Sequence, residues 1–162
     1  VAVSATVPNV HDIGEWLGVA PPNVLVFGPE HRPVPLRTVV RGIRSAKNEF
    51  IFQEGLNREL PATIRQYSGG RATLIFCITK RACETAAKAM LLEPELLQRD
   101  PHLQNRLAEN TKRVTDPGLK QLIRHGVAVH HAGLTPEDRR IVTEMFLCGA
   151  LLLICCTQTL AL

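Results

Sequence analysis

The sequence has no run approaching the roughly 20 apolar residues that a membrane-spanning helix needs. It also has no basic segment followed by an apolar run near Val1, so no secretory signal is visible. Hydrophobic residues make up 45% of the 162 residues, which is enough to build a core and argues against full disorder. These features favour one globular unit of ordinary domain size.

CxxC spacing is absent as well, and the number of cysteines, five, is odd. They are Cys77, Cys83, Cys148, Cys155 and Cys156. Three of them lie in apolar runs, where a reduced cysteine behaves as a small hydrophobic residue. A disulfide framework and a zinc site are therefore disfavoured. We expect structural thiols in a reducing compartment, the cytosol or the nucleus.

Several catalytic signatures are also missing. The sequence holds no GxxxxGK(S/T) phosphate loop, no acidic metal-binding pair after an apolar strand, no GxSxG and no HExxH. We therefore assign no catalytic residue and no metal ligand in this chain. Its formal charge of +4 and pI near 9.0 permit a nucleic-acid partner without requiring one.

The first 52 residues contain weak signals. The apolar runs Val1 to Val3 and Val24 to Phe27 are typical of strands, and Asn9 can cap a helix between them. After a proline-rich stretch, Leu36 to Arg41 alternates apolar and basic residues, which predicts a strand with a basic face, and Phe50 to Phe52 is expected to pair with it. That face could contact phosphates, or its charges could simply block aggregation, which is the commoner role.

From Asn57 onward, helix and strand signals alternate. Helices are expected over residues 57–67, 80–92, 94–113, 116–125 and 135–148, and buried strands over 73–77, 127–130 and 151–156. Gly126 suits the left-handed residue that ends a helix. This alternation predicts an α/β fold with right-handed crossovers, a parallel sheet and helices on its faces.

In an open parallel sheet, ligands collect at the carboxyl ends of the strands, so the turns there are the candidate site. The residues of these turns are Thr79, Lys80 and Arg81; His130, His131 and Gly133; and Thr157 and Thr159. Lys80 and Arg81 sit unfavourably at a helix N-terminus unless a phosphate binds there, and the alternative is that both point into water. The third turn offers two hydroxyls and backbone amides, which suit a sugar-phosphate chain.

The histidine pair does not suit a metal. Consecutive strand residues point to opposite faces, so His130 and His131 cannot converge on one ion. We expect one imidazole in the core and the other on the ligand edge. The following helix begins with Thr135 as its cap, and Glu137 and Asp138 are expected to satisfy the helix end.

Five segments, in this order, resemble motifs of the superkiller-type group of superfamily 2 DExH-box helicases. SAT at Ser4 to Thr6 resembles motif III, RPVPL the connector between the two RecA-like domains, and TLIFCITKR motif IV. VAVHHAGLTPEDRRIVTEMF resembles the HHAG segment and LLLICCTQTLA the start of motif V. FIFQEGLNREL with YSGGRATLIFC further resembles the meiotic crossover-promoting DNA helicases of this group.

The resemblance implies a piece of a larger, nuclear enzyme. Residues 1–28 would end a first RecA-like domain, 29–48 would form a connector and edge strand, and 49–162 would form a second RecA-like domain, incomplete at its C-terminus. The parent enzyme would hydrolyse ATP with Mg²⁺ and move 3′-to-5′ along single-stranded DNA, separating duplexes or branched recombination intermediates. The piece alone would bind neither cofactor and would be inactive.

The resemblance also implies roles for individual residues. Ser4, Ala5 and Thr6 would couple closure over ATP to strand separation. The residues implied to contact nucleic acid are Thr79, Lys80, Arg81, His130, His131, Gly133, Thr157 and Thr159. The partners would be single-stranded or branched DNA and the rest of the helicase chain, with no membrane. Two alternatives stay open: a non-catalytic nucleic-acid- or protein-binding module, and an RNA helicase of the same group.

Overall fold

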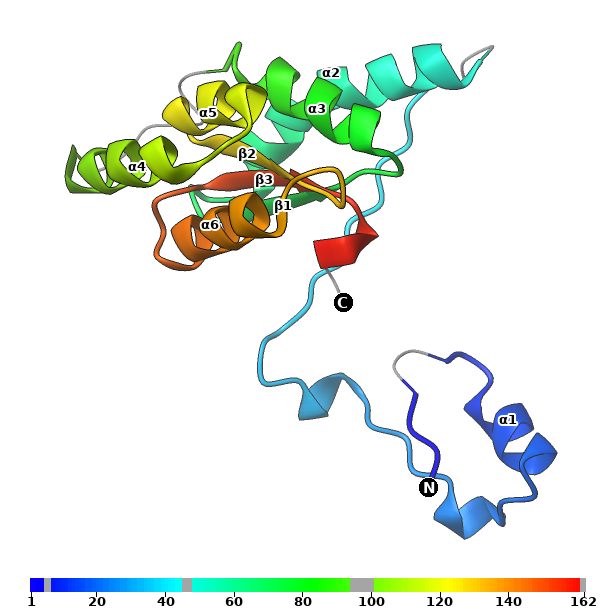
Figure 1. Cartoon of the computed structure of the whole chain (residues 1–162). Coiled ribbons are helices and arrows are strands. Elements are labelled where there is room, and N and C mark those ends of the chain that lie inside the picture. Colours follow the sequence, from blue (N-terminus) through cyan, green and yellow to red (C-terminus); the bar gives the residue numbers. More distant parts are fainter. Residues whose placement is uncertain (5–6, 45–47, 94–100, 161–162) are drawn as a thin grey trace. The chain divides into compact units, whose positions relative to one another are not determined.

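The structure is a computed structural model that describes residues 1–4, 7–44, 48–93 and 101–160 (Figure 1). It divides into two compact units, Val1–Gly42 and Ile43–Leu162, which are described separately. The assignment of residues 1–28, 29–48 and 49–162 to helicase domains stays a prediction. In the part of the chain with described coordinates, no helix is long and apolar enough to cross a membrane.

The first unit contains one α-helix and two short 3₁₀ turns. Helix α1 spans Val10–Trp16, and the turns η1 and η2 span Pro21–Asn23 and Pro29–His31. Helix α1 follows Asn9 as expected, but the Asn9 side chain makes no capping hydrogen bond.

The strands predicted in the first unit are not formed. Residues 1–3, 24–27 and 36–41 have neither helix nor strand structure. An apolar run becomes a strand only where another strand offers its backbone groups, and no described segment of this unit does so. The expected edge strand with a basic face is therefore wrong.

Helix α2 spans Glu49–Tyr67, so it begins well before the expected Asn57. The expectation that Phe50 to Phe52 would pair as a strand is wrong, because these residues form the first turn of α2. The Asn48 side chain caps this helix by accepting a 2.9 Å hydrogen bond from the Ile51 amide. This local capping bond needs no distant partner, whereas a strand at Phe50 would need one.

Three parallel strands form the sheet of the second unit. They are β1 (Thr73–Phe76), β2 (Val127–His130) and β3 (Leu153–Cys156), in the order β1-β3-β2. All residues of β2 and β3 are buried, as their continuous apolar runs predicted. Strand β1 lies at the end of this order, and its Leu74 and Phe76 side chains are exposed. The expectation that residues 73–77 form a buried strand is therefore wrong, because among the described residues β1 has only one neighbouring strand and the face that carries Leu74 and Phe76 is exposed.

Helices cover the sheet on both faces (Figure 1). They are α3 (Lys80–Met90), α4 (Pro101–Arg113), α5 (Pro117–Arg124) and α6 (Pro136–Leu147), and a last 3₁₀ turn, η4, spans Gln158–Leu160. Helices α3 and α5 lie on one face, whereas α6 lies on the other. The predicted α/β class with a parallel sheet is confirmed. Gly126, after α5, has the expected positive φ of 82°.

The core joins the sheet to these helices and includes the cysteines. All five cysteines are free, and Cys83, Cys155 and Cys156 are buried. Burial raises the pKa of Cys83 to about 12 and that of Cys156 to about 11, and it also raises the pKa of Cys155. Thiols of this kind stay protonated at neutral pH and serve as core side chains, in agreement with the sequence-based interpretation.

Candidate functional site

The carboxyl ends of the three strands form one edge of the sheet. Phe76, Cys156 and His130 are paired in register at that edge. The Cys77 amide donates a 2.7 Å hydrogen bond to the Cys156 carbonyl, and the Thr157 amide donates a 3.2 Å bond to the His130 carbonyl. The turns that follow the strands therefore start side by side. We call this edge, with residues 78–81, 130–133 and 157–160, the ligand edge.

The first turn leads directly into helix α3. Thr79 is the helix cap, and its hydroxyl accepts a 3.1 Å hydrogen bond from the Ala82 amide. Thr79, Lys80 and Arg81 are all exposed, and the first turn of α3 contains no acidic residue. The helix N-terminus thus presents two cations at the positive end of the helix dipole, an arrangement that favours an anion.

The second turn, the HHAG loop (His130, His131, Ala132 and Gly133), contacts α3. The Gly133 amide donates a 3.2 Å hydrogen bond to Nδ1 of His131. A Cβ atom on Gly133 would lie 3.1 Å from that Nδ1 and 3.3 Å from Cδ of Lys80. A larger residue would therefore crowd the His131 ring and the Lys80 side chain, which shows that Lys80 lies close to the loop.

The two histidines point to opposite faces of the sheet, as expected. Nε2 of His131 lies 3.9 Å from Oε1 of Glu84 on α3, whereas His130 lies close enough to Arg139 on α6 for that charge to act on it. Burial lowers the pKa of His130, and the positive charge of Arg139 lowers it further.

The expectation that one imidazole would face the ligand edge is wrong. Both histidines are buried, with exposed fractions of 6% for His130 and 5% for His131. Helices from both sides of the sheet cover them, and strand alternation alone does not reveal that cover. Any contact of this turn with a ligand therefore comes from its backbone and from the exposed Ala132 and Gly133.

The third turn already makes contacts with the rest of the fold. Thr157 is half-buried, and its amide already donates to His130, so this amide is not available to a ligand as the sequence suggested. Thr159 lies in η4, but its side chain is outside the described part of the structure.

The motif III residues lie in the first unit. Ser4 is exposed, whereas Ala5 and Thr6 lie outside the described residues. The structure thus brings together the turns of the second unit, and the coupling role of Ser4, Ala5 and Thr6 stays a prediction.

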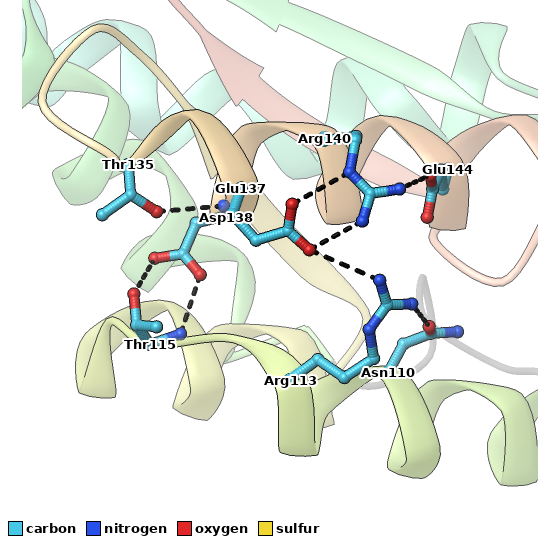
Figure 2. Close-up of polar contacts among 8 residues, drawn as sticks. All are labelled: Asn110, Arg113, Thr115, Thr135, Glu137, Asp138, Arg140 and Glu144. Carbon is cyan, nitrogen blue, oxygen red and sulfur yellow. Dashed lines mark hydrogen bonds and ion pairs between the residues drawn. The ribbon is translucent and has the colours of Figure 1, made fainter.

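The acidic residues of α6 have different partners from those expected. Thr135 caps α6 by accepting a 3.1 Å bond from the Asp138 amide, as predicted. The Asp138 carboxylate, however, is fully buried and accepts bonds from the amide and hydroxyl of Thr115 (Figure 2). It also accepts a bond from the amide of Asp116. It joins the start of α6 to the turn between α4 and α5, so the expectation that it satisfies its own helix end is wrong.

Glu137 is also paired through its side chain. It accepts hydrogen bonds from Arg140 on the same helix and from Arg113 on α4 (Figure 2). The hydrogen bonds from Arg140 lower the pKa of the Glu137 carboxyl, and the charges of Arg140 and Arg113 add to that effect. Neither acid of the first turn faces the helix amides, which leaves Thr135 as the side-chain cap of α6.

Glu84 is a neighbour of the candidate site that no sequence motif indicated. It lies one helical turn after Lys80, and the two share one face of α3. The i, i+4 spacing of Lys80 and Glu84 is visible in the sequence. Only the packing of α3 against β2 shows that His131 lies beneath Glu84.

Known relatives match almost the whole chain. An ATP-dependent DNA helicase homolog MER3 of Arabidopsis thaliana is 37% identical, with 99% of this chain and 15% of the relative covered. The human probable ATP-dependent DNA helicase HFM1 is 37% identical, with 100% of this chain and 12% of the relative covered. The pre-mRNA-splicing factor brr2 of Schizosaccharomyces pombe is 33% identical, with 99% of this chain and 8% of the relative covered.

No family model matches the chain. The relatives nevertheless confirm the resemblance to this helicase group, and the chain spans 15% or less of the length of each of the three.

Proposed function

Because the chain is homologous over nearly its whole length to one segment of the MER3 and HFM1 helicases, we propose that it is part of an ATP-dependent DNA helicase. Within that enzyme, the ligand edge of the second unit holds single-stranded DNA through its phosphates. The proposal includes a nuclear location and a role in meiotic recombination, which follow from the same resemblance.

One observation carries the proposal of a phosphate grip. The cationic N-terminus of α3 and the HHAG loop lie against each other at the carboxyl end of a parallel sheet, with the Lys80 side chain beside Gly133. This is the edge at which α/β sheets bind ligands. Exposed cations, helix amides and glycine backbone suit a phosphate better than they suit a base edge.

Each residue of this edge has a distinct part in the proposal. Lys80 and Arg81 neutralise phosphate charge, and the Thr79 hydroxyl, which accepts from Ala82, still has its own proton to donate. Gly133 allows a close approach of the loop backbone. His130 and His131 are buried and support the loop instead of contacting the ligand. Thr157 lies between the other two turns.

ATP and Mg²⁺ belong to the proposed whole enzyme. The 162 residues contain no GxxxxGK(S/T) phosphate loop, and no group of three metal-binding side chains occurs among the residues with described positions. The residues present do not fit either group, so we derive no nucleotide step from this chain. ATP supplies the energy for movement when it binds elsewhere in the enzyme.

The finer features of the proposal are a 3′-to-5′ direction and a preference for branched or recombination DNA. Both come from the motif resemblance. Coupling of strand separation to ATP would involve the motif III residues Ser4, Ala5 and Thr6. A translocation assay with DNA of defined polarity tests the direction, and binding to branched and linear DNA of equal length tests the preference.

The proposed grip is tested by DNA binding in the whole protein. Lys80→Ala is expected to weaken binding to a labelled single strand and to reduce the salt slope by about 1, since one phosphate contact is lost. Lys88→Ala is the matched control, because Lys88 is an exposed lysine in the last turn of the same helix. Equal effects of the two variants, or none from Lys80→Ala, would contradict the grip.

RNA is the second candidate ligand. The relative brr2 is named as a pre-mRNA-splicing factor, and phosphate contacts do not by themselves separate RNA from DNA. Measuring the affinity of the whole protein for single strands of matched sequence in RNA and DNA decides between them. Tighter binding to RNA with RNA-stimulated ATP hydrolysis would favour the RNA helicase.

A further inference from the structure

His131 is held between its own loop and helix α3. Its Nδ1 accepts the hydrogen bond from the Gly133 amide, and an amide can only donate. The proton of the neutral imidazole is therefore on Nε2. The loop and the histidine tautomer thus depend on each other.

Nε2 of His131 is buried and has no hydrogen-bond partner within the described structure. A buried donor without a partner is costly, and such groups call for a specific explanation. The nearest acidic atom given by the structure is Oε1 of Glu84, at 3.9 Å, slightly beyond hydrogen-bond distance. Because the Glu84 side chain is 51% exposed, it has room to rotate and close this gap.

Glu84 is unexpected at this place on electrostatic grounds. It lies one turn after Lys80, beside an edge whose other charges favour an anion. A carboxylate there repels a phosphate chain, so its presence needs a compensating role. Accepting the His131 proton supplies such a role, since it satisfies the buried nitrogen and fixes the ring.

We propose that Glu84 is a positioning residue for the HHAG loop. It accepts the proton on Nε2 of His131 in a hydrogen bond and thereby keeps Nδ1 directed at the Gly133 amide. The loop backbone is then held in the position from which it meets the ligand. This inference rests on the proposed function only for its effect on DNA binding, because the effect on the His131 ring is independent of any ligand.

The test compares two substitutions of Glu84 in the whole protein. Glu84→Ala removes the acceptor and is expected to weaken single-stranded DNA binding about fivefold, the value of one ordinary hydrogen bond. Glu84→Gln keeps an acceptor oxygen without the charge, and should retain the wild-type affinity or exceed it. Glu109→Ala, at an exposed position on α4, is the control for removing one negative charge.

A double-mutant cycle shows whether Glu84 acts through His131. Asn in place of His131 can still accept from the Gly133 amide but has no Nε2 proton. In the His131→Asn background, Glu84→Ala is therefore expected to have no further effect on binding. A fivefold effect that persists in this background would overturn the proposed route, and tighter binding by Glu84→Ala in the wild-type background would show that Glu84 acts only by charge.

A second readout needs no DNA. Ring ¹⁵N shifts of labelled histidine, assigned with His131→Asn, should show the Nε2-protonated tautomer of His131 in the wild type and in Glu84→Gln. Glu84→Ala should give a mixture of ring states, with no more than a small loss of thermal stability from the missing hydrogen bond. An unaltered tautomer in Glu84→Ala would refute the inference. Wild-type protein that does not bind DNA, with the expected ring shifts, would instead refute only the proposed function.

Discussion

The carboxylate of Asp138 accepts hydrogen bonds of 2.7 Å from the amide and 2.6 Å from the hydroxyl of Thr115. Asp138 lies in α6, whereas Thr115 lies in the turn between α4 and α5, and Figure 2 shows how the contact joins these two segments. The Asp116 amide adds a third hydrogen bond to the same carboxylate. Asp138 therefore joins the start of α6, which follows the HHAG loop in the chain, to the turn between α4 and α5.

Removing this carboxylate should destabilise the fold. Asp138→Ala leaves the buried donors of Thr115 and Asp116 without an acceptor, and we expect a loss of about 3 kcal/mol in the free energy of unfolding. Urea unfolding followed by circular dichroism measures this loss. Glu137→Ala is the matched control, since the neighbouring Glu137 is exposed and should matter much less. Equal losses for both variants would show that the Asp138 carboxylate contributes no more to the free energy of unfolding than the exposed Glu137 does.

The same carboxylate should make stability depend on acid pH. Burial raises the pKa of Asp138, but the hydrogen bonds from Thr115 and Asp116 outweigh burial and hold that pKa below its ordinary value. A lowered pKa in the folded state adds stability above the unfolded pKa of about 3.9, and that stability is lost as the pH falls further. Asp138→Asn should flatten the loss below about pH 4. An unchanged pH profile would contradict this assignment.

His130 should produce a second, separate pH dependence. Its pKa is lowered in the folded state, chiefly by burial, so the unfolded chain binds the proton more readily. The stability that this pKa difference contributes is fully present above the unfolded pKa of about 6.5. It declines as the pH falls below that value. Unfolding measured between neutral and mildly acidic pH should show this decline in the wild type, and it should be smaller in His130→Gln. A wild-type profile that is flat across this range would argue against a buried neutral His130.

The buried thiols should be protected from alkylation. Cys83, Cys155 and Cys156 are buried and have raised pKa values, so the reactive thiolate is rare and inaccessible. Under native conditions, iodoacetamide should modify these three only after unfolding, whereas Cys148, which is partly exposed, should react sooner. Mass spectrometry of peptides from native and denatured samples measures the difference. Rapid native labelling of Cys155 would contradict the described core.

The isolated 162-residue chain should show no ATP hydrolysis above background. Its sequence contains no phosphate loop and no acidic pair after an apolar strand that could hold Mg²⁺. Phosphate release by the purified chain, with and without single-stranded DNA, tests this expectation, and the whole protein serves as the positive control. Measurable turnover by the chain alone would refute it.

Sequence patterns were reliable where the evidence for an element is local. The buried strands β2 and β3 follow from uninterrupted apolar runs, and α6 begins directly after Thr135, which caps it through its own side chain as predicted. The turns of the ligand edge follow from the same logic, since parallel strands share the edge at which they end.

Patterns failed where an element needs a distant partner. Alternation over Leu36 to Arg41 predicted a strand, but no described segment offers it a backbone to pair with. Phe50 to Phe52 joined a helix instead, because the Asn48 cap is available locally. The burial of both imidazoles, rather than of one, was equally hidden, since it depends on helices α6 and α3 from other parts of the chain.

The sequence alone thus determined the α/β class, the buried parallel strands β2 and β3, the Thr135 cap and the order of the polar turns, because each depends on residues close together in the chain. Only the tertiary structure decided that Asp138 binds Thr115, that Glu84 lies beside His131 and that the Lys80 side chain lies near Gly133. The members of each of these pairs lie on different elements. Their approach depends on how helices pack on the sheet, which no local pattern of residues specifies.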